Sequence, residues 1–289
     1  AFFLRTLLGP LFLLLLTAFF TLWERRILGA TQSRMGPART GFAGLFTPFL
    51  DGIKLLLREV HQPTSVGAPF FIWPSLALFL VLVGGSLSPR GYPSFCRPHL
   101  FFILFLVLGG FLAWLVALGA RTSGSGYPLL RARRRVRQRV GYELVWSTTF
   151  FFPLALGAFL TPSTTLAWPM RLVGPFWLGA FFCLLAETHR APADTVERES
   201  ELVSGYTTEL AGWAFTSFFL AEVSHLWLSC FLLSSFWTRS PRAALPLIWL
   251  VVLRRAGLPR IRYDAIMDLC WKVGLPATLR ASLMAFFLR

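Results

Sequence analysis

ETHRAPADTVERESELVSGYTTE, residues 187–209, holds six of the thirteen acidic residues in a chain of 289 residues. Long apolar runs flank it on both sides, at about 172–187 and 209–236. Carboxylates at the border of a bilayer are costly unless they are paired, solvated or protonated. The stretch therefore predicts either a solvated acidic loop or a functional site between two membrane spans.

The composition of the whole chain is that of a membrane protein. Hydrophobic residues make up 55% of it, aromatic residues 16%, and the mean hydropathy is +0.63. A helix needs about 20 apolar residues to cross a bilayer core. We therefore predict a single all-α membrane domain over residues 1–289, with about eight transmembrane helices. Their expected ranges are 2–23, 69–88, 100–120, 141–161, 172–187, 209–236, 241–256 and 269–288.

Two of these predicted spans are irregular, and the first needs to be distinguished from a targeting segment. The fifth is short, and Pro246 interrupts the seventh. The first has an apolar core too long for a signal peptide, so we expect it to be a membrane span.

Basic residues set the expected orientation of the spans. The net charge of +15 would suggest nucleic acid in a soluble protein, but here most Lys and Arg follow the odd-numbered spans. Such loops face the cytoplasm or the matrix, so we expect no nucleic-acid partner. The richest segment, RARRRVRQR at 131–139, is predicted to be a loop that stops translocation and contacts phospholipid headgroups.

The first long loop contains a predicted amphipathic helix within 41–59. Thr47, Asp51, Lys54 and Arg58 recur at helical spacing, opposite a set of apolar residues. A helix of this kind lies in the membrane interface. It could be a surface anchor only, although Asp51 is acidic where an anchor would favour Lys or Arg.

Acidic residues inside apolar spans are candidate functional residues. Glu143, which follows Tyr142, falls in the fourth span and Glu222 in the sixth. An acid at such a depth is a functional hypothesis by default, although a hydrogen-bonded structural acid is the alternative. His225 lies one helical turn beyond Glu222 and is a potential partner for it.

The acidic loop itself has cationic residues close by in the sequence. Asp194, Glu197 and Glu201 would share one face of a helix and repel one another. Arg190 and Arg198, each four residues from Asp194, could neutralise them. The last odd-numbered loop supplies further cations, namely Arg254, Arg255, Arg260 and Arg262.

The motifs of soluble catalysis are missing from the sequence. We find no nucleophile elbow, P-loop, dinucleotide fingerprint or kinase motif set. The four cysteines are isolated, so no iron–sulfur cluster or zinc site is encoded. Any redox centre is expected in a partner.

Four sequence blocks together resemble the family of NADH dehydrogenase subunit 1, a membrane subunit of respiratory complex I. They are ERRILGATQSRMGPARTG at 24–41, GLFTPFLDGIKLLLRE at 44–59, the acidic stretch at 187–209 and RIRYDAIMDLCWKVGLP at 260–276. They occur in family order and at family spacing, and the resemblance covers essentially the whole chain.

The resemblance implies a subunit of NADH:ubiquinone reductase with no redox centre of its own. Partner subunits would hold the FMN and the iron–sulfur clusters, and ubiquinone would be the substrate. Other complex I subunits, of the hydrophilic arm and of the membrane, are the implied partners, with phospholipids such as cardiolipin around them. The implied location is the mitochondrial inner membrane, with odd-numbered loops in the matrix, in preference to a bacterial plasma membrane.

The resemblance also implies roles for individual residues. Those of the first and last loops would line a quinone tunnel or meet the hydrophilic arm: Arg25, Arg34, Asp51, Lys54, Glu59, Arg255, Arg260, Arg262 and Asp264. A second set would form a proton relay along the membrane: Tyr142, Glu143, Glu187, Asp194, Glu197, Glu199, Glu201, Glu209 and Glu222.

Several positions depart from the family pattern. His189 and Arg198 add positive charge to the acidic loop, and Ala38 replaces a usual Asn. Arg135 and Arg137 stand where small residues are common.

Three other functions fit parts of the sequence. A proton-coupled secondary transporter would use Glu143 and Glu222 as an ion site and would carry ions without partners. A membrane anchor of an ion-translocating hydrogenase would share the fold, but the ESELVSG block and the GPAR stretch favour the quinone-linked branch. A purely structural scaffold would lose assembly, and not quinone binding, when its acids are changed.

Overall fold

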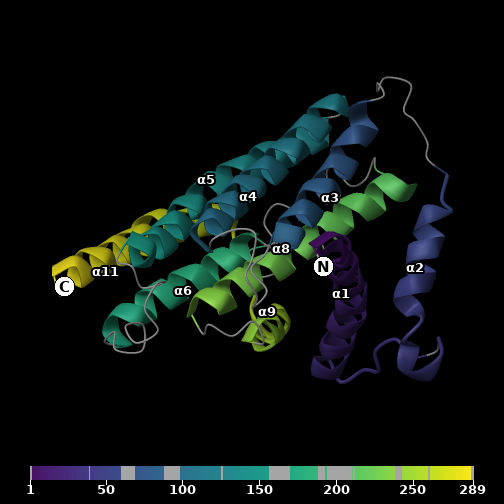
Figure 1. Cartoon of the computed structure of the whole chain (residues 1–289), viewed down its shortest axis with the longest axis horizontal. Helices are drawn as coiled ribbons and strands as arrows, with labels where there is room; N and C mark the ends of the chain where they lie inside the picture. Colours follow the sequence, from purple (N-terminus) through teal and green to yellow (C-terminus); the bar gives the residue numbers. More distant parts are fainter. Residues whose placement is uncertain are drawn as a thin grey trace.

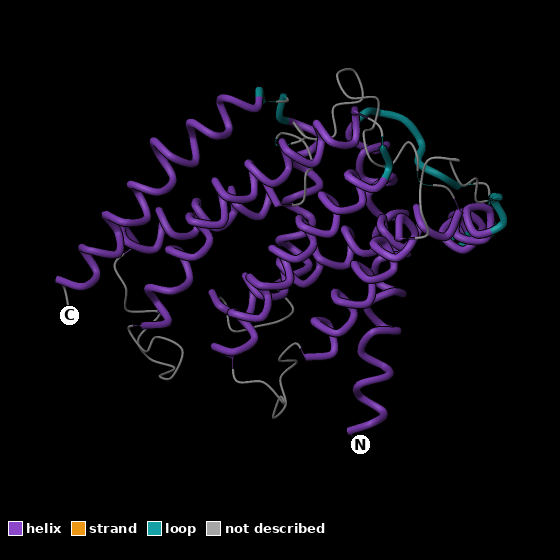
Figure 2. The backbone as a smooth tube through the Cα atoms, turned by 90° about the horizontal axis from the view of Figure 1, so that it is seen from above, coloured by secondary structure: helices purple, strands orange, loops and turns teal. Residues whose placement is uncertain are grey.

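The computed structural model describes residues 2–38, 40–59, 69–87, 98–124, 126–155, 170–187, 193, 210, 212–237, 243–259 and 261–287. Throughout these residues the regular structure is helical, as the backbone tube in Figure 2 shows. The prediction of an all-α chain is confirmed for this part of the protein.

Every predicted span contains a described helix, and most boundaries fall within a few residues of the expected ones. Residues 156–161 of the fourth predicted span lie outside the described residues. The first half contains α1 (Phe2–Thr31), a 3₁₀ turn η1 (Phe42–Gly44), α2 (Thr47–Leu56), α3 (Pro69–Leu87) and α4 (Pro98–Thr122). The second half contains α5 (Gly126–Ala155), α6 (Met170–Glu187), α8 (Gly212–Trp237), α9 (Ala244–Gly257), α10 (Tyr263–Asp268), a π-helical turn η4 (Leu269–Gly274) and α11 (Leu275–Phe287).

Prolines mark the starts of several helices. Pro48, Pro69, Pro98, Pro128 and Pro246 all lie in a first turn, where a missing N–H costs no hydrogen bond. The expected interruption at Pro246 is therefore wrong, because α9 begins at Ala244 and runs through it. At the other end of a helix, Gly124 follows α4 with a φ of 72°, in the left-handed region that favours glycine after a helix.

Two of the described helices are long and apolar enough to cross a membrane, at Leu100–Thr122 and Gly212–Ser235. Phe71–Leu87 and Phe176–Glu187 form shorter apolar helices. The first helix extends to Thr31, so Glu24, Arg25 and Arg26 belong to its last turns and not to the following loop.

The helices form one bundle in which α3, α4, α5 and α8 are central. Figure 1 shows α4 and α5 side by side, with α11 continuing along α5 and with α1 and α2 at the opposite end. Aromatic rings fill the interior: Trp146 stacks on Phe150 at 4.8 Å between centroids, and Phe150 meets Phe102 of α4 at 4.9 Å. Such contacts add about 0.5–1.5 kcal/mol each beyond the area that they bury.

The arginine-rich segment 131–139 is helical, which contradicts the predicted loop. It lies within α5, which is unbroken from Gly126 to Ala155. Arg131, Arg135 and Arg139 recur every four residues, so they share one face, and all three are buried. The segment is helical because that face meets carboxylates and a neighbouring helix, which the positive-inside interpretation did not consider.

A proline substitution in segment 131–139 tests whether the segment is a helix or a loop. Arg137 is exposed, so Arg137→Ala should change stability little. Arg137→Pro should cost about 3 kcal/mol or more, because it removes a hydrogen bond from the interior of α5. The thermal midpoint of the assembled protein would measure the difference, and equal midpoints for the two variants would favour a loop.

Candidate functional site: a buried ion-pair cluster

A cluster of charged and polar side chains lies inside the bundle, where α4, α5, α6 and α8 meet. We call it the buried cluster and define it as Arg135, Arg139, Tyr142, Glu143, Glu187, Glu222 and His225. Its cations come from α5, whose buried face carries an arginine at each turn. Its carboxylates come from three different helices, so the cluster ties α5 to α6 and α8.

The ion pair between Arg139 and Glu187 is the most deeply buried. Nη1 of Arg139 lies 2.6 Å from Oε1 of Glu187, and their side chains are 7% and 2% exposed. The same Nη1 donates to the Tyr142 hydroxyl at 3.3 Å, and Nε donates to Glu143 at 3.3 Å. Breaking a buried pair by removing one partner costs about 3–5 kcal/mol, because the other charge stays unpaired.

Helix α4 makes room for the Arg139 guanidinium through a glycine. Nη2 donates to the carbonyl oxygen of Leu106 at 3.4 Å. A Cβ at Gly109 would overlap this guanidinium, whereas a Cβ at Gly110 would meet no atom within 4 Å. Gly109 therefore lets a charged group lie directly against an apolar helix.

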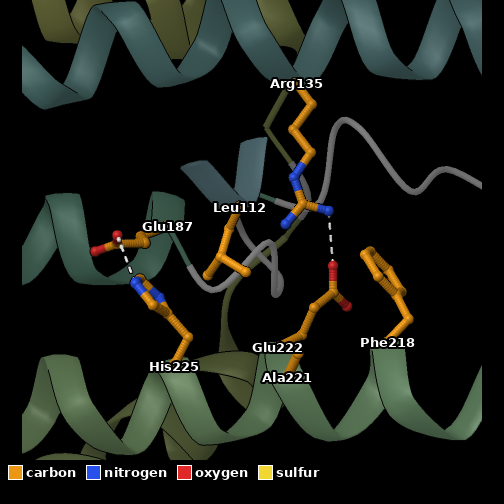
Figure 3. A pocket seen from close by; sticks show the side chains of 7 residues that line it. All are labelled: Leu112, Arg135, Glu187, Phe218, Ala221, Glu222 and His225. Carbon is orange, nitrogen blue, oxygen red and sulfur yellow. Dashed lines mark hydrogen bonds and ion pairs between the residues drawn. The ribbon is translucent and has the colours of Figure 1, made fainter. Parts of the chain in front are cut away.

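A second ion pair joins α5 to α8. Nη1 of Arg135 lies 2.7 Å from Oε1 of Glu222, and the Arg135 guanidinium lies 5.7 Å from the centroid of the Phe218 ring. Figure 3 shows Arg135 reaching across from its helix to Glu222, with Phe218 beside the pair. The arginine is 8% exposed and the glutamate 27%, so this pair is partly open on its acidic side.

His225 faces Glu187, and not Glu222 as its sequence spacing suggested. Its Nε2 lies 3.7 Å from Oε1 of Glu187, and its ring stacks on Phe105 of α4 at 5.0 Å between centroids. Among the described residues Nε2 has no hydrogen-bond partner, and neither does Oε2 of Glu187. Glu222 has Arg135 as its partner instead.

A small cavity lies between the two ion pairs. Its volume is about 30 Å³, and it is lined by Leu112, Arg135, Glu187, Phe218, Ala221, Glu222 and His225. A water molecule needs about 10–15 Å³ on this measure, together with two to four polar partners. The cavity thus has room for about two waters among groups that can hydrogen-bond them.

A second set of charged residues lies where α1 meets α2 and α9. Arg25 Nη1 lies 2.9 Å from Asp51 Oδ2, and Arg255 Nη1 lies 2.6 Å from Glu24 Oε1. The first pair is half exposed, whereas the Glu24 side chain is only 9% exposed. These two pairs, which we call the α1 cluster, attach the amphipathic helix and α9 to the end of the first helix.

The structure distributes the predicted site residues over these two clusters and the surface. Tyr142, Glu143, Glu187 and Glu222 belong to the buried cluster, and Arg25, Asp51 and Arg255 to the α1 cluster. Arg34, Lys54 and Glu59 are exposed, while Arg262 pairs with Asp264 at 3.1 Å on the surface. Arg260, Asp194, Glu197, Glu199, Glu201 and Glu209 lie outside the described residues.

Four residues of these clusters were not predicted as site residues: Glu24, Arg135, Arg139 and His225. The spacing of the arginines was the missed signal, because positions 131, 135 and 139 fall on one helical face together with Tyr142. The remaining two had weaker signals. Glu24 stood at the end of an apolar run, and His225 was considered only as a partner for Glu222.

In the described part of the chain, no group of three or more His, Cys, Asp or Glu could hold a metal ion. Cys183, Cys230 and Cys270 are free thiols and are buried.

The described helices and the buried cluster define a helical membrane protein with charged groups inside its bundle. Residues 5–286 match the family model described as NADH dehydrogenase. Relatives named NADH-ubiquinone oxidoreductase chain 1 are similar to this chain over nearly its whole length. The one from Mytilus edulis is 37% identical over 93% of this chain and 92% of its own length. Those from Xenopus laevis and Balaenoptera physalus are 35% and 36% identical, over 94% and 95% of this chain and 90% and 92% of their own lengths.

The chain therefore belongs to the NADH dehydrogenase family, as a member of its subunit 1 branch in respiratory complex I. The resemblance found in the sequence blocks is confirmed.

Gly109 offers a test of the Arg139 position. Gly109→Ala should displace the guanidinium and weaken its pair with Glu187, lowering stability by about 3 kcal/mol. Gly110→Ala is the matched control, since a Cβ there meets open space and Ala is about 1 kcal/mol better than Gly inside a helix. Thermal inactivation of the assembled complex would measure both, and equal effects would contradict the position of Arg139.

Proposed function

We propose that this chain forms much of the quinone access tunnel of a proton-pumping NADH:ubiquinone oxidoreductase. It also carries the polar relay that couples quinone reduction to proton translocation. In this proposal it crosses the mitochondrial inner membrane eight times, with α2 in the interface and with the odd-numbered loops in the matrix. Partner subunits hold the FMN and the iron–sulfur clusters.

The observation that carries the relay is the position of the buried cluster. Three carboxylates, two arginines, a tyrosine and a histidine lie together inside the bundle, between α5, α6 and α8. Charged groups at such depth are expensive and mark ion or proton pathways. Coupled groups of this kind exchange protons as a set, so a change of charge nearby shifts their occupancy.

The aromatic residues beside the α1 cluster support the proposal of a quinone tunnel. A quinone has an apolar tail and a polar head, so it needs an apolar passage with polar groups at its inner end. Phe19 of α1 meets Phe49 of α2 at 5.9 Å between ring centroids. The Arg25–Asp51 pair lies at the same junction and provides the polar end.

An aromatic contact joins α1 to α8, the helix that carries His225 and Glu222. Phe20, next to Phe19 in α1, meets Trp227 of α8 at 6.0 Å between centroids. Trp227 lies two residues beyond His225 on the same helix. A displacement of α1 by a bound quinone would therefore be transmitted to the helix that carries His225 and Glu222.

The transporter alternative is less well supported by this geometry. It needs Glu143 and Glu222 in one ion site, but Glu143 is bonded to Arg139 and Glu222 to Arg135.

The exposed arginines of α5, Arg133 and Arg137, remain candidates for contacts with acidic phospholipids such as cardiolipin.

Glu143→Gln tests the relay without stranding a deeply buried charge, because Glu143 is 37% exposed and Arg139 keeps its pair with Glu187. Quinone reduction and proton pumping by the assembled complex should both fall about tenfold or more, as expected for a lost proton-transfer group. Asp268→Asn, which changes an exposed pair with Lys272, is the control and should retain activity. Wild-type rates in Glu143→Gln would exclude the relay.

Asp51→Asn tests the inner end of the tunnel. An exposed ion pair contributes less than about 1 kcal/mol to stability, so the variant should assemble normally. The KM for a short-chain quinone should rise, because the polar end of the passage is changed. An unchanged KM would place the quinone head elsewhere.

A further inference from the structure

His225 belongs to the buried cluster, but neither this residue nor the cavity beside it has so far been given an individual role. The side chain is 7% exposed, and its Nε2 points towards Glu187 across the cavity edge (Figure 3). Its ring plane is fixed by stacking on Phe105, with an angle of 13° between the rings. An imidazole held in this way keeps Nε2 close to Glu187 at the wall of the cavity.

The two ion pairs limit what the neighbouring carboxylates can do. Arg139 binds Oε1 of Glu187 and Arg135 binds Oε1 of Glu222, and hydrogen bonding to a cation favours the ionised form of an acid. Each pair is neutral as a whole. A proton that passes between them needs a group that can accept it without breaking a pair.

We propose that His225 is this group and carries protons between Glu187 and Glu222 through its Nε2 atom. This inference rests on the proposed relay and assigns a further residue to it. The charged groups that face His225 are Glu187 from α6, Arg135 and Arg139 from α5, and Glu222 from its own helix. Helix α4 contributes the Phe105 ring and the Leu112 side chain.

The proton balance of the transfer is simple. When a proton reaches Oε2 of Glu187, the oxygen that has no hydrogen-bond partner among the described residues, Nε2 of His225 takes it. This step leaves the Glu187 carboxylate paired with Arg139 and an imidazolium ion. The imidazolium then gives the proton from Nε2, through water in the cavity, to the carboxylate oxygen of Glu222 that Arg135 does not bind. His225 returns to its neutral form, so no other reactant is needed.

The negative charge on Glu187 stabilises the intermediate. Its Oε1 atom lies 3.7 Å from Nε2, close enough for an electrostatic interaction that favours the imidazolium ion. The cavity has room for about two waters, which are sufficient to bridge one helical turn along α8. The arrangement thus supplies a charge partner and a path for the same atom.

His225→Gln in the assembled complex, reconstituted in proteoliposomes, tests the inference. Gln keeps a polar side chain that can hydrogen-bond but cannot carry a proton, so a purely structural role would survive it. We expect quinone reduction and proton pumping to fall about tenfold, while NADH oxidation by a water-soluble acceptor of the hydrophilic arm is unchanged. Ser224→Ala, a buried neighbour on α8 whose hydroxyl bonds only to its own helix in the described structure, should behave as wild type.

A second variant separates proton transfer from cavity filling. His225→Ala should regain activity when imidazole is added, but not when thiazole is added, because thiazole has a similar shape and is far less basic. Equal recovery with both compounds would overturn the inference, as would wild-type turnover of His225→Gln. Glu143→Gln, measured in parallel, reports on the proposed relay itself: if it is impaired while His225→Gln is not, only the role of His225 fails.

Discussion

The buried ion pair between Arg139 and Glu187 is the constraint on which the interior of this protein depends. Two opposite charges lie 2.6 Å apart inside the bundle, and their side chains are 7% and 2% exposed. Removing each charge from water costs free energy, so the pair needs further polar groups around it. Those groups are supplied by Tyr142 and Glu143 on the same helix and by the Leu106 carbonyl, with Gly109 leaving the necessary space.

This pair gives the arginine-rich segment a different meaning from that of a topology signal. Exposed arginines and arginines that face buried acids occur on opposite sides of one helix. Arg133 and Arg137 are exposed, while Arg135 and Arg139 bind Glu222 and Glu187. One helix can therefore serve both the membrane surface and the polar interior.

Much of the fold was predictable from the sequence, because long apolar runs can satisfy their backbone groups in a membrane only as helices. The acids Glu143, Glu187 and Glu222 were predictable for the same reason, since a carboxylate in an apolar run is conspicuous. Their partners were not. Arg139 lies four residues from Glu143 but 48 from Glu187, and only the packing of α5 against α6 shows which acid it binds most closely. The pairing of Glu24 with Arg255 spans 231 residues and has no local signal.

The central claim is that quinone chemistry near α1 is linked to a paired and hydrated cluster between α5, α6 and α8. An experimental structure of the intact assembly, at a resolution that shows waters and with a quinone analogue bound, tests it most directly. We predict Arg139 within hydrogen-bond distance of Glu187, water in the cavity beside His225, and the quinone passage reaching Arg25 and Asp51. An Arg139 side chain turned to lipid or solvent, or a dry apolar wall between His225 and Glu222, would contradict the account.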